Sequence, residues 1–179
     1  MIYNVSQLLK ANPGTALRVD LDDADDLDLR DGEATLAGPV EGSVRLHRTN
    51  QGIYADGTVM VPIELTCARC LNPFTTTLEF PLREQYYPTI DVNTGVPLSP
   101  PDDELAFPID HNHVLDLREA IRQNLVLALP FKPLCREDCA GLCPRCGKDL
   151  NEGLCDCPPE EIDDRFAALR ALLGEQAEA

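Results

Sequence analysis

The chain has 179 residues, 44% of them hydrophobic, which is enough for one compact domain with a small appendage. Its formal net charge of −16 repels nucleic-acid phosphate over the surface as a whole, so any RNA contact must be local. The first residues lack the basic leader of a signal peptide, and no stretch reaches the roughly 20 apolar residues of a membrane span. We therefore expect a cytoplasmic protein that does not enter a membrane.

Four runs within the first 88 residues alternate apolar and polar side chains, which is the pattern of half-buried strands. Within the third run, Asp56-Gly57 is a turn signal and predicts that this run is split into two strands. The expected fold class is α+β, built on an antiparallel β-sheet or a partly closed barrel. The four runs are residues 15–21, 34–47, 52–65 and 74–86.

Two segments of this half carry no regular pattern. Carboxylates crowd residues 20–33, but an EF-hand calcium loop starting at Asp20 needs glycine and glutamate where the chain has Asp25 and Asp31. A solvated acidic loop is expected instead. Residues 89–112 are rich in proline and acidic side chains, and they predict an irregular connector.

Two helices are predicted in the second half of the chain. The first spans about 116–129, where Asp116 and Glu119 form a capping box and Pro130 ends the helix. The second opens at Pro158-Pro159 and stops near Gly174. We expect a mainly β core of residues 1–134 with the first helix packed on it, and a cysteine-rich tail of residues 135–179 ending in the second helix. The apolar stripes are Leu117, Ile121, Leu125 and Ala128 in the first helix, and Ile162, Phe166, Leu169 and Leu173 in the second.

Eight cysteines dominate the candidate chemistry, and a reducing cytosol favours thiols or metal thiolates over disulfides. The segment Cys143-Pro144-Arg145-Cys146-Gly147 has the form of a metal knuckle, in which Gly147 takes a positive φ. Cys155 and Cys157 follow closely and supply two more thiolates. The spacing therefore predicts a local zinc site with four cysteine ligands.

The remaining cysteines fall in two pairs, Cys67 with Cys70 at the end of a predicted strand and Cys135 with Cys139 after the predicted helix. Their combination gives a second tetrathiolate zinc site that ties the sheet to the tail. Closing the intervening loop costs about 4 kcal/mol, whereas apparent zinc binding supplies about 10 to 16 kcal/mol. The alternative is that Cys139 joins the tail site and leaves Cys67 and Cys70 as free thiols. We favour two complete structural sites because four plus four leaves no cysteine unused.

Other chemistries remain as alternatives. Iron suits tetrahedral sulfur coordination as zinc does. A thiol oxidoreductase needs its Cys-x-x-Cys at a helix N-terminus, whereas Cys67 follows a predicted strand. The histidines His47, His111 and His113 lie away from any ligand spacing and receive no role. Four thiolates leave no open metal position for water, and no nucleophile or phosphate-binding motif is present, so we expect no enzymatic activity.

The same residues carry a family resemblance. The segments are Leu65-Thr66-Cys67-Ala68-Arg69-Cys70-Leu71 with Phe74, Leu127-Ala128-Leu129-Pro130, Gly141-Leu142-Cys143 and Asp149-Leu150-Asn151. Together with the cysteines of residues 135–157 they resemble the YceD family, whose bacterial and plastid members are linked to accumulation of large-subunit ribosomal RNA. The resemblance implies a role in synthesis, processing or assembly of that RNA, with ribosomal RNA or large-subunit assembly intermediates as partners.

Charge bears on which partner is contacted directly. Residues 118–148 hold more basic than acidic side chains, although a zinc tetrathiolate carries a net charge of about −2 that offsets this excess. The candidate RNA contacts are Arg69, Arg136, Arg145 and Lys148. The alternative is an adaptor whose acidic surface binds a basic ribosomal protein or assembly factor. Its candidate acidic residues are Asp20, Asp22, Asp23, Asp25 and Asp26.

Overall fold

The computed structural model describes residues 1–23, 27, 29, 34–99 and 106–158. Its main element is a six-stranded sheet in the order β2-β4-β5-β6-β7, in which β3 also pairs with β5. Neighbouring strands are antiparallel except β6 and β7, which are parallel. The strands are β2 (Ala16–Asp23), β3 (Thr35–Leu36), β4 (Val40–Arg48), β5 (Ile53–Thr66), β6 (Pro73–Pro88) and β7 (Phe107–Ile109).

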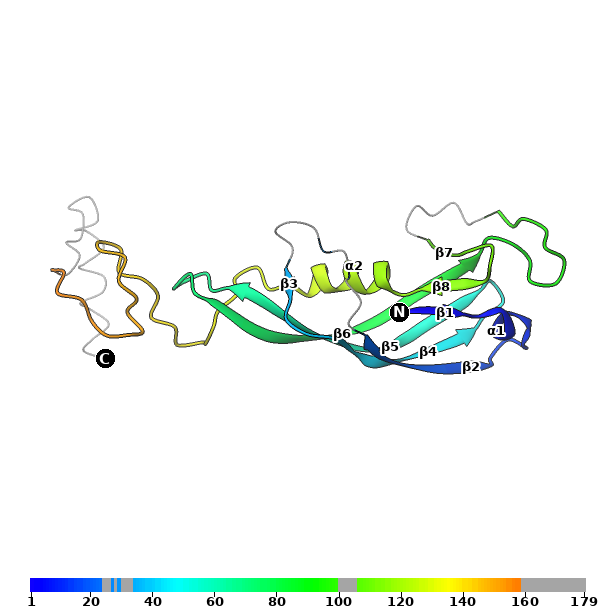
Figure 1. Cartoon of the computed structure of the whole chain (residues 1–179), viewed down its shortest axis with the longest axis horizontal. Helices are drawn as coiled ribbons and strands as arrows, with labels where there is room; N and C mark the ends of the chain where they lie inside the picture. Colours follow the sequence, from blue (N-terminus) through cyan, green and yellow to red (C-terminus); the bar gives the residue numbers. More distant parts are fainter. Residues whose placement is uncertain (24–26, 28, 30–33, 100–105, 159–179) are drawn as a thin grey trace, which may run out of the picture.

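The remaining elements lie on one face of this sheet. Helix α2 (Arg118–Ala128) runs along it. A two-stranded sheet of β1 (Ile2–Asn4) and β8 (Val114–Asp116) follows next to α2, and the short helix α1 (Ser6–Lys10) lies at the end of the sheet away from α2 (Figure 1). The fold is thus α+β with an open sheet, whose edges are β2 and β7. Within the described residues, no helix has the length and apolar character needed to cross a membrane.

Strand alternation decides which side chains reach the core. The apolar residues of β5 at every second position are fully buried, while their neighbours face the other side of the sheet. Helix α2 covers the apolar side with Ala120, Ile121 and Leu125, all fully buried, and Asn124 donates a 2.8 Å hydrogen bond to Glu84 of β6. The buried β5 residues are Ile53, Ala55, Val59, Val61 and Ile63.

The first predicted helix is confirmed with narrower bounds. Helix α2 begins at Arg118, and the Asp116 carboxylate accepts the Arg118 backbone N–H at 2.9 Å. Glu119, the other residue of the predicted capping box, pairs with Arg122 at 2.8 Å, one turn further along. Pro130 follows the helix end as expected. The second predicted helix lies in residues 159–179, outside the described part of the chain.

Two predictions about the strands are wrong. The Asp56-Gly57 signal does not split its run, because β5 continues through it and Gly57 pairs with both Val44 and Leu82. The run 34–47 is instead divided into β3 and β4 by Gly38-Pro39, since proline has no N–H to donate to a sheet.

Two segments expected to be irregular are partly ordered into strands. The connector of residues 89–112 contains β7, and Ile90 forms a bridge with Pro97. Strand β2 follows the predicted run 15–21 and continues to Asp23, so Asp22 and Asp23 of the expected acidic loop belong to a strand, and most of the rest of that loop lies outside the described residues. The division of the chain at residue 134 stays a prediction.

Gly57 is required where β4 and β5 approach each other closely. A Cβ at this position would lie 2.3 Å from the Ser43 carbonyl oxygen and 2.7 Å from the Val44 Cα. Both contacts involve backbone atoms, so the two strands would have to move apart to accept a side chain.

We therefore predict that Gly57→Val lowers the free energy of unfolding by about 2 kcal/mol or more, since overpacking of this kind costs about 1 to 3 kcal/mol. Thr58→Val is the matched control, because Thr58 is exposed and its replacement should change stability by less than about 0.5 kcal/mol. Urea unfolding followed by far-ultraviolet circular dichroism gives both values. Equal midpoints for the two variants would contradict this account of the glycine.

Candidate metal centres

The tip of the β5–β6 hairpin holds the first pair of cysteines. Cys67 follows the last residue of β5, and its N–H donates to the Asn72 carbonyl at 3.0 Å. The Leu71 N–H then donates to the Cys67 carbonyl at 3.0 Å, which closes a tight loop around the two cysteines. Leu71 has a φ of 60°, a conformation that non-glycine residues seldom adopt. The hairpin turn is thus a knuckle with both cysteines buried.

The predicted knuckle in the tail has the same backbone pattern. The Gly147 N–H donates to the Cys143 carbonyl at 2.9 Å, and Gly147 has a φ of 74°. Each knuckle therefore places a residue of positive φ directly after its second cysteine, with the same hydrogen bond back to the first. The sequence revealed this geometry only in the tail, because the hairpin uses Leu71 where glycine is the usual signal.

The first cysteine of each knuckle is held as a thiolate by backbone N–H groups. The N–H groups of Cys70, Cys135 and Arg69 lower the pKa of Cys67 to about 6. Those of Cys146 and Arg145 lower the pKa of Cys143 to about 6 as well. Because the thiolate is the form that ligates metal, the first cysteine of each knuckle is suited to metal binding, whereas the pKa of Cys70 is raised.

Cys135 and Cys139 come to the hairpin from the chain after α2. The Cys67 and Cys139 Sγ atoms are 3.8 Å apart, as are the Cys70 and Cys135 Sγ atoms. All four sulfurs lie within 4.8 Å of one another, and all eight cysteines of the chain are free, with no disulfide among them. We call these four residues the hairpin site.

The second cluster, which we call the tail site, is formed by Cys143, Cys146, Cys155 and Cys157, whose sulfurs also lie within 4.8 Å of one another. The Cys143 N–H donates to the Lys148 carbonyl at 2.8 Å. The Lys148 ammonium in turn donates to the Leu154 carbonyl at 2.8 Å, which holds the second cysteine pair against the knuckle. The grouping matches the predicted four plus four, and Cys139 does not join the tail site.

Polar side chains join the two sites to each other. The Asn151 carboxamide oxygen accepts the Ala140 N–H at 2.9 Å, and its nitrogen donates to the Cys139 sulfur at 3.5 Å. Asn72 of the hairpin donates to the Asp149 carboxylate at 2.8 Å. In the sequence, Asp149 and Asn151 stand out only through the family resemblance. Asn72 does not stand out at all, because an isolated asparagine has no characteristic spacing.

The four predicted RNA contacts surround the two sites and are all exposed. Three of them already hold the tail together: Arg69 donates to the Cys139 carbonyl at 2.9 Å, Arg136 to Asn151 at 2.6 Å, and Lys148 to Leu154. Arg145 also has a partner. Their contact with RNA stays a prediction. In the described residues, the clusters able to hold a metal contain only cysteines and none of the three histidines.

Comparisons with known proteins agree on one family. The model of the family described as "Large ribosomal RNA subunit accumulation protein YceD" matches residues 55–173, a span that includes all eight cysteines. No solved structure matches the chain.

Curated relatives come from bacteria and plants. An uncharacterised protein of Mycobacterium bovis is 34% identical over 140 residues, covering 75% of this chain and 62% of the relative. Chloroplast proteins named large ribosomal RNA subunit accumulation protein YCED homolog 1 are 28% identical in Arabidopsis thaliana and 29% identical in Zea mays. These matches cover 75% and 69% of this chain, and 48% and 50% of the plant proteins. The chain thus spans about half to three-fifths of the length of these relatives. It belongs to the YceD family of large ribosomal RNA subunit accumulation proteins.

Proposed function

We propose that this chain is a cytoplasmic, non-enzymatic protein that binds two structural zinc ions and supports synthesis, processing or assembly of large-subunit ribosomal RNA. The RNA role rests on family membership. The metal role rests on the two clusters of four cysteine sulfurs. Reduced cysteines in this number fit a reducing compartment, which is the basis for the cytoplasmic assignment.

The sulfur spacing supports zinc. Zinc–thiolate bonds are about 2.3 Å long, and the edge of a tetrahedron with that radius is about 3.8 Å. The two Sγ–Sγ distances of the hairpin site are both 3.8 Å, whereas a disulfide needs about 2.05 Å. Four thiolates saturate such an ion and leave no position for substrate or water, so each zinc would act on the fold.

A thiol oxidoreductase finds little support in the same geometry. Cys67 follows strand β5 and does not begin a helix, and Cys67, Cys70 and Cys139 are buried. A redox dithiol needs an accessible thiolate for exchange with its substrate.

The second candidate function is an acidic adaptor for a basic ribosomal protein or assembly factor. The formal charge of −16 favours this partner over RNA for the surface as a whole. In this case the zinc sites serve the fold in the same way, and only the direct partner differs.

Crosslinking in growing cells, followed by purification of the tagged chain and identification of both RNA and protein, tests the proposal. We expect large-subunit ribosomal RNA or its precursors in the crosslinks, and loss of captured ribosomal proteins after ribonuclease treatment. Capture of a basic ribosomal protein that survives ribonuclease would favour the adaptor. Crosslinks with neither class of molecule would remove the ribosomal role and leave the metal assignment standing.

The two proposed zinc ions should differ in their effect on stability. The hairpin site closes the loop from Cys67 to Cys135, so Cys70→Ser should lose a crosslink worth about 4 kcal/mol and lower the melting temperature by about 10 °C. Cys146→Ser should shift melting by less than about 3 °C, because the tail site closes only within residues 143–157. Differential scanning calorimetry on metal-loaded protein measures both shifts. Equal shifts would count against the assignment of the long-range link to the hairpin site.

A further inference from the structure

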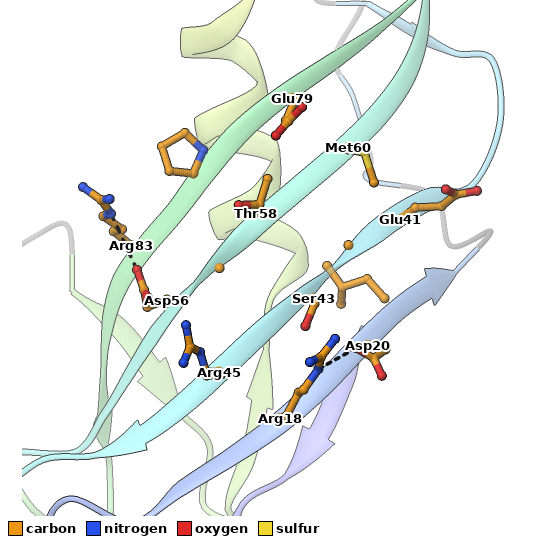
Figure 2. A pocket seen from close by; sticks show the side chains of 14 residues that line it. Arg18, Asp20, Glu41, Ser43, Arg45, Asp56, Thr58, Met60, Glu79 and Arg83 are labelled. Carbon is orange, nitrogen blue, oxygen red and sulfur yellow. Dashed lines mark hydrogen bonds and ion pairs between the residues drawn. The ribbon is translucent and has the colours of Figure 1, made fainter.

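One face of the main sheet is left open. Helix α2 packs on the other face, while β2, β4, β5 and β6 together form a trough of about 1040 Å³ on the open one (Figure 2). Its lining is polar and charged, apart from Leu21, Met60, Pro81 and two glycines. None of the residues that line this trough belongs to the metal sites, so the metal sites do not explain why charged side chains gather here.

Strand register gathers the basic residues of this face into one row. Arg18 of β2 lies opposite Arg45 of β4, Arg45 lies opposite Asp56 of β5, and Asp56 lies opposite Arg83 of β6. Adjacent strands are about 4.8 Å apart, so the backbone positions of Arg18 and Arg45 are about 5 Å apart and those of Arg45 and Arg83 about 10 Å. We call Arg18, Arg45 and Arg83 the arginine row.

The arginine row is incompletely neutralised. Arg18 pairs with Asp20 at 3.1 Å and Arg83 with Asp56 at 3.6 Å, but both arginine side chains are 69% exposed, so the pairs are weak (Figure 2). The Arg45 guanidinium has no hydrogen bond or ion pair with any residue in the described part of the chain. By contrast Arg48, also on β4, donates to the Leu9 carbonyl at 3.1 Å and serves the fold.

The opposition of Arg18 and Arg45 has a cost in the free protein. Like charges directly across a strand pair destabilise a sheet, and Asp20 beside Arg18 and Asp56 opposite Arg45 offset this repulsion only in part, because three arginines of the row face two carboxylates. A bound anion would remove the repulsion. Arginine is also the side chain whose planar fork holds phosphate oxygens in two parallel hydrogen bonds.

The neighbouring rows limit where an anion can lie. On one side, beyond Ser43 and Thr58, come Glu41 and Glu79, both exposed, and these carboxylates repel phosphate. On the other side His47 lies opposite Tyr54, and neither side chain has a hydrogen bond or ion pair within the described residues. By strand alternation both rings share the face of the arginine row. Aromatic rings beside arginines on a sheet are a surface on which unpaired bases stack.

We propose that this face binds a single-stranded segment of RNA, with its phosphates on the arginine row and a base stacked on Tyr54. The proposal rests on the proposed ribosomal RNA function and gives it a surface separate from the metal sites. The opposed arginines, the aromatic rings on one side of them and the acidic side chains on the other together favour RNA over a basic protein segment, which would be drawn to Glu41 and Glu79 instead.

Fluorescence anisotropy with a labelled single-stranded oligouridine and the metal-loaded protein tests the phosphate contacts. Arg45→Gln should weaken binding by at least about 5-fold, whereas Lys10→Gln, which removes one exposed charge from α1, should leave it within about 2-fold. The combined replacement of the arginine row by glutamine should reduce the slope of log affinity against log salt by about 2, at roughly 0.7 per lost contact.

The acidic row supplies a test of opposite sign. Glu41→Gln with Glu79→Gln should tighten oligouridine binding, because it removes repulsion beside the phosphates. A basic protein partner would instead be weakened by the same change. This variant keeps the arginine row, so it remains informative even if the combined arginine variant fails to fold.

Tyr54 separates stacking from charge. Tyr54→Ala should weaken oligouridine binding by about 5-fold or more, and Tyr54→Phe should restore it, since a phenyl ring stacks as well. Equal loss in both variants would overturn the stacking assignment.

The remaining outcomes separate a failure of the proposed RNA-binding face from a failure of the proposed ribosomal RNA function. Suppose that the wild-type chain crosslinks to large-subunit RNA in cells, but that the Arg45→Gln and Lys10→Gln variants bind oligouridine equally well. The assignment of RNA binding to the sheet face is then wrong, and the ribosomal role stands. If the wild-type chain shows neither oligouridine binding nor RNA crosslinks, both the RNA-binding sheet face and the proposed ribosomal RNA function are wrong. Tighter binding of single-stranded DNA than of oligouridine of the same length would overturn the choice of RNA.

Discussion

Four sulfurs at the hairpin site connect two parts of the chain that are far apart in sequence. Cys67 and Cys70 lie at the tip of the long β5–β6 hairpin, and Cys135 and Cys139 follow α2, whose buried face packs on the body of the sheet. A metal ion between them would close a ring that runs through β6, the connector and α2. The hairpin extends away from the body toward the tail (Figure 1), so this ring would fix the position of the hairpin tip. The tail site then builds on the hairpin site through Asn72, Asp149 and Asn151.

This arrangement separates the parts of the molecule that hold the fold from the surface available to a partner. Arg69, Arg136 and Lys148 are committed to backbone carbonyls and to Asn151 around the metal sites. The side chains of the arginine row do not hold the fold in this way. Their exposed ion pairs are weak, so a ligand can replace the carboxylates at little cost in free energy. In a strongly acidic chain, a bound polyanion would be confined to this row, and its orientation would be set by the acidic side chains on one side and the aromatic rings on the other.

How far the sequence predicts this structure depends on the range of each interaction. Most of the strand positions, α2 and the tail site follow from local periodicity and ligand spacing. The hairpin site is predicted by a different argument, namely that two groups of four use all eight cysteines. The uninterrupted β5 does not follow from the local pattern, because Gly57 looks like a turn until its contacts with Ser43 and Val44 of another strand are known. The knuckle geometry at Leu71 is likewise hidden, since a leucine gives no hint of a positive φ. The arginine row appears only when the register of four strands is fixed, and pairing register is a long-range property that alternation within one strand leaves open.

The metal content of the purified chain, combined with alkylation of the native protein, tests the hairpin site most directly. Two tetrathiolate sites require two zinc ions per chain, with Cys67 and Cys70 protected from alkylation until a chelator is added. A single zinc ion per chain, with Cys67 and Cys70 alkylated in the native protein while the tail cysteines stay protected, would contradict the hairpin site.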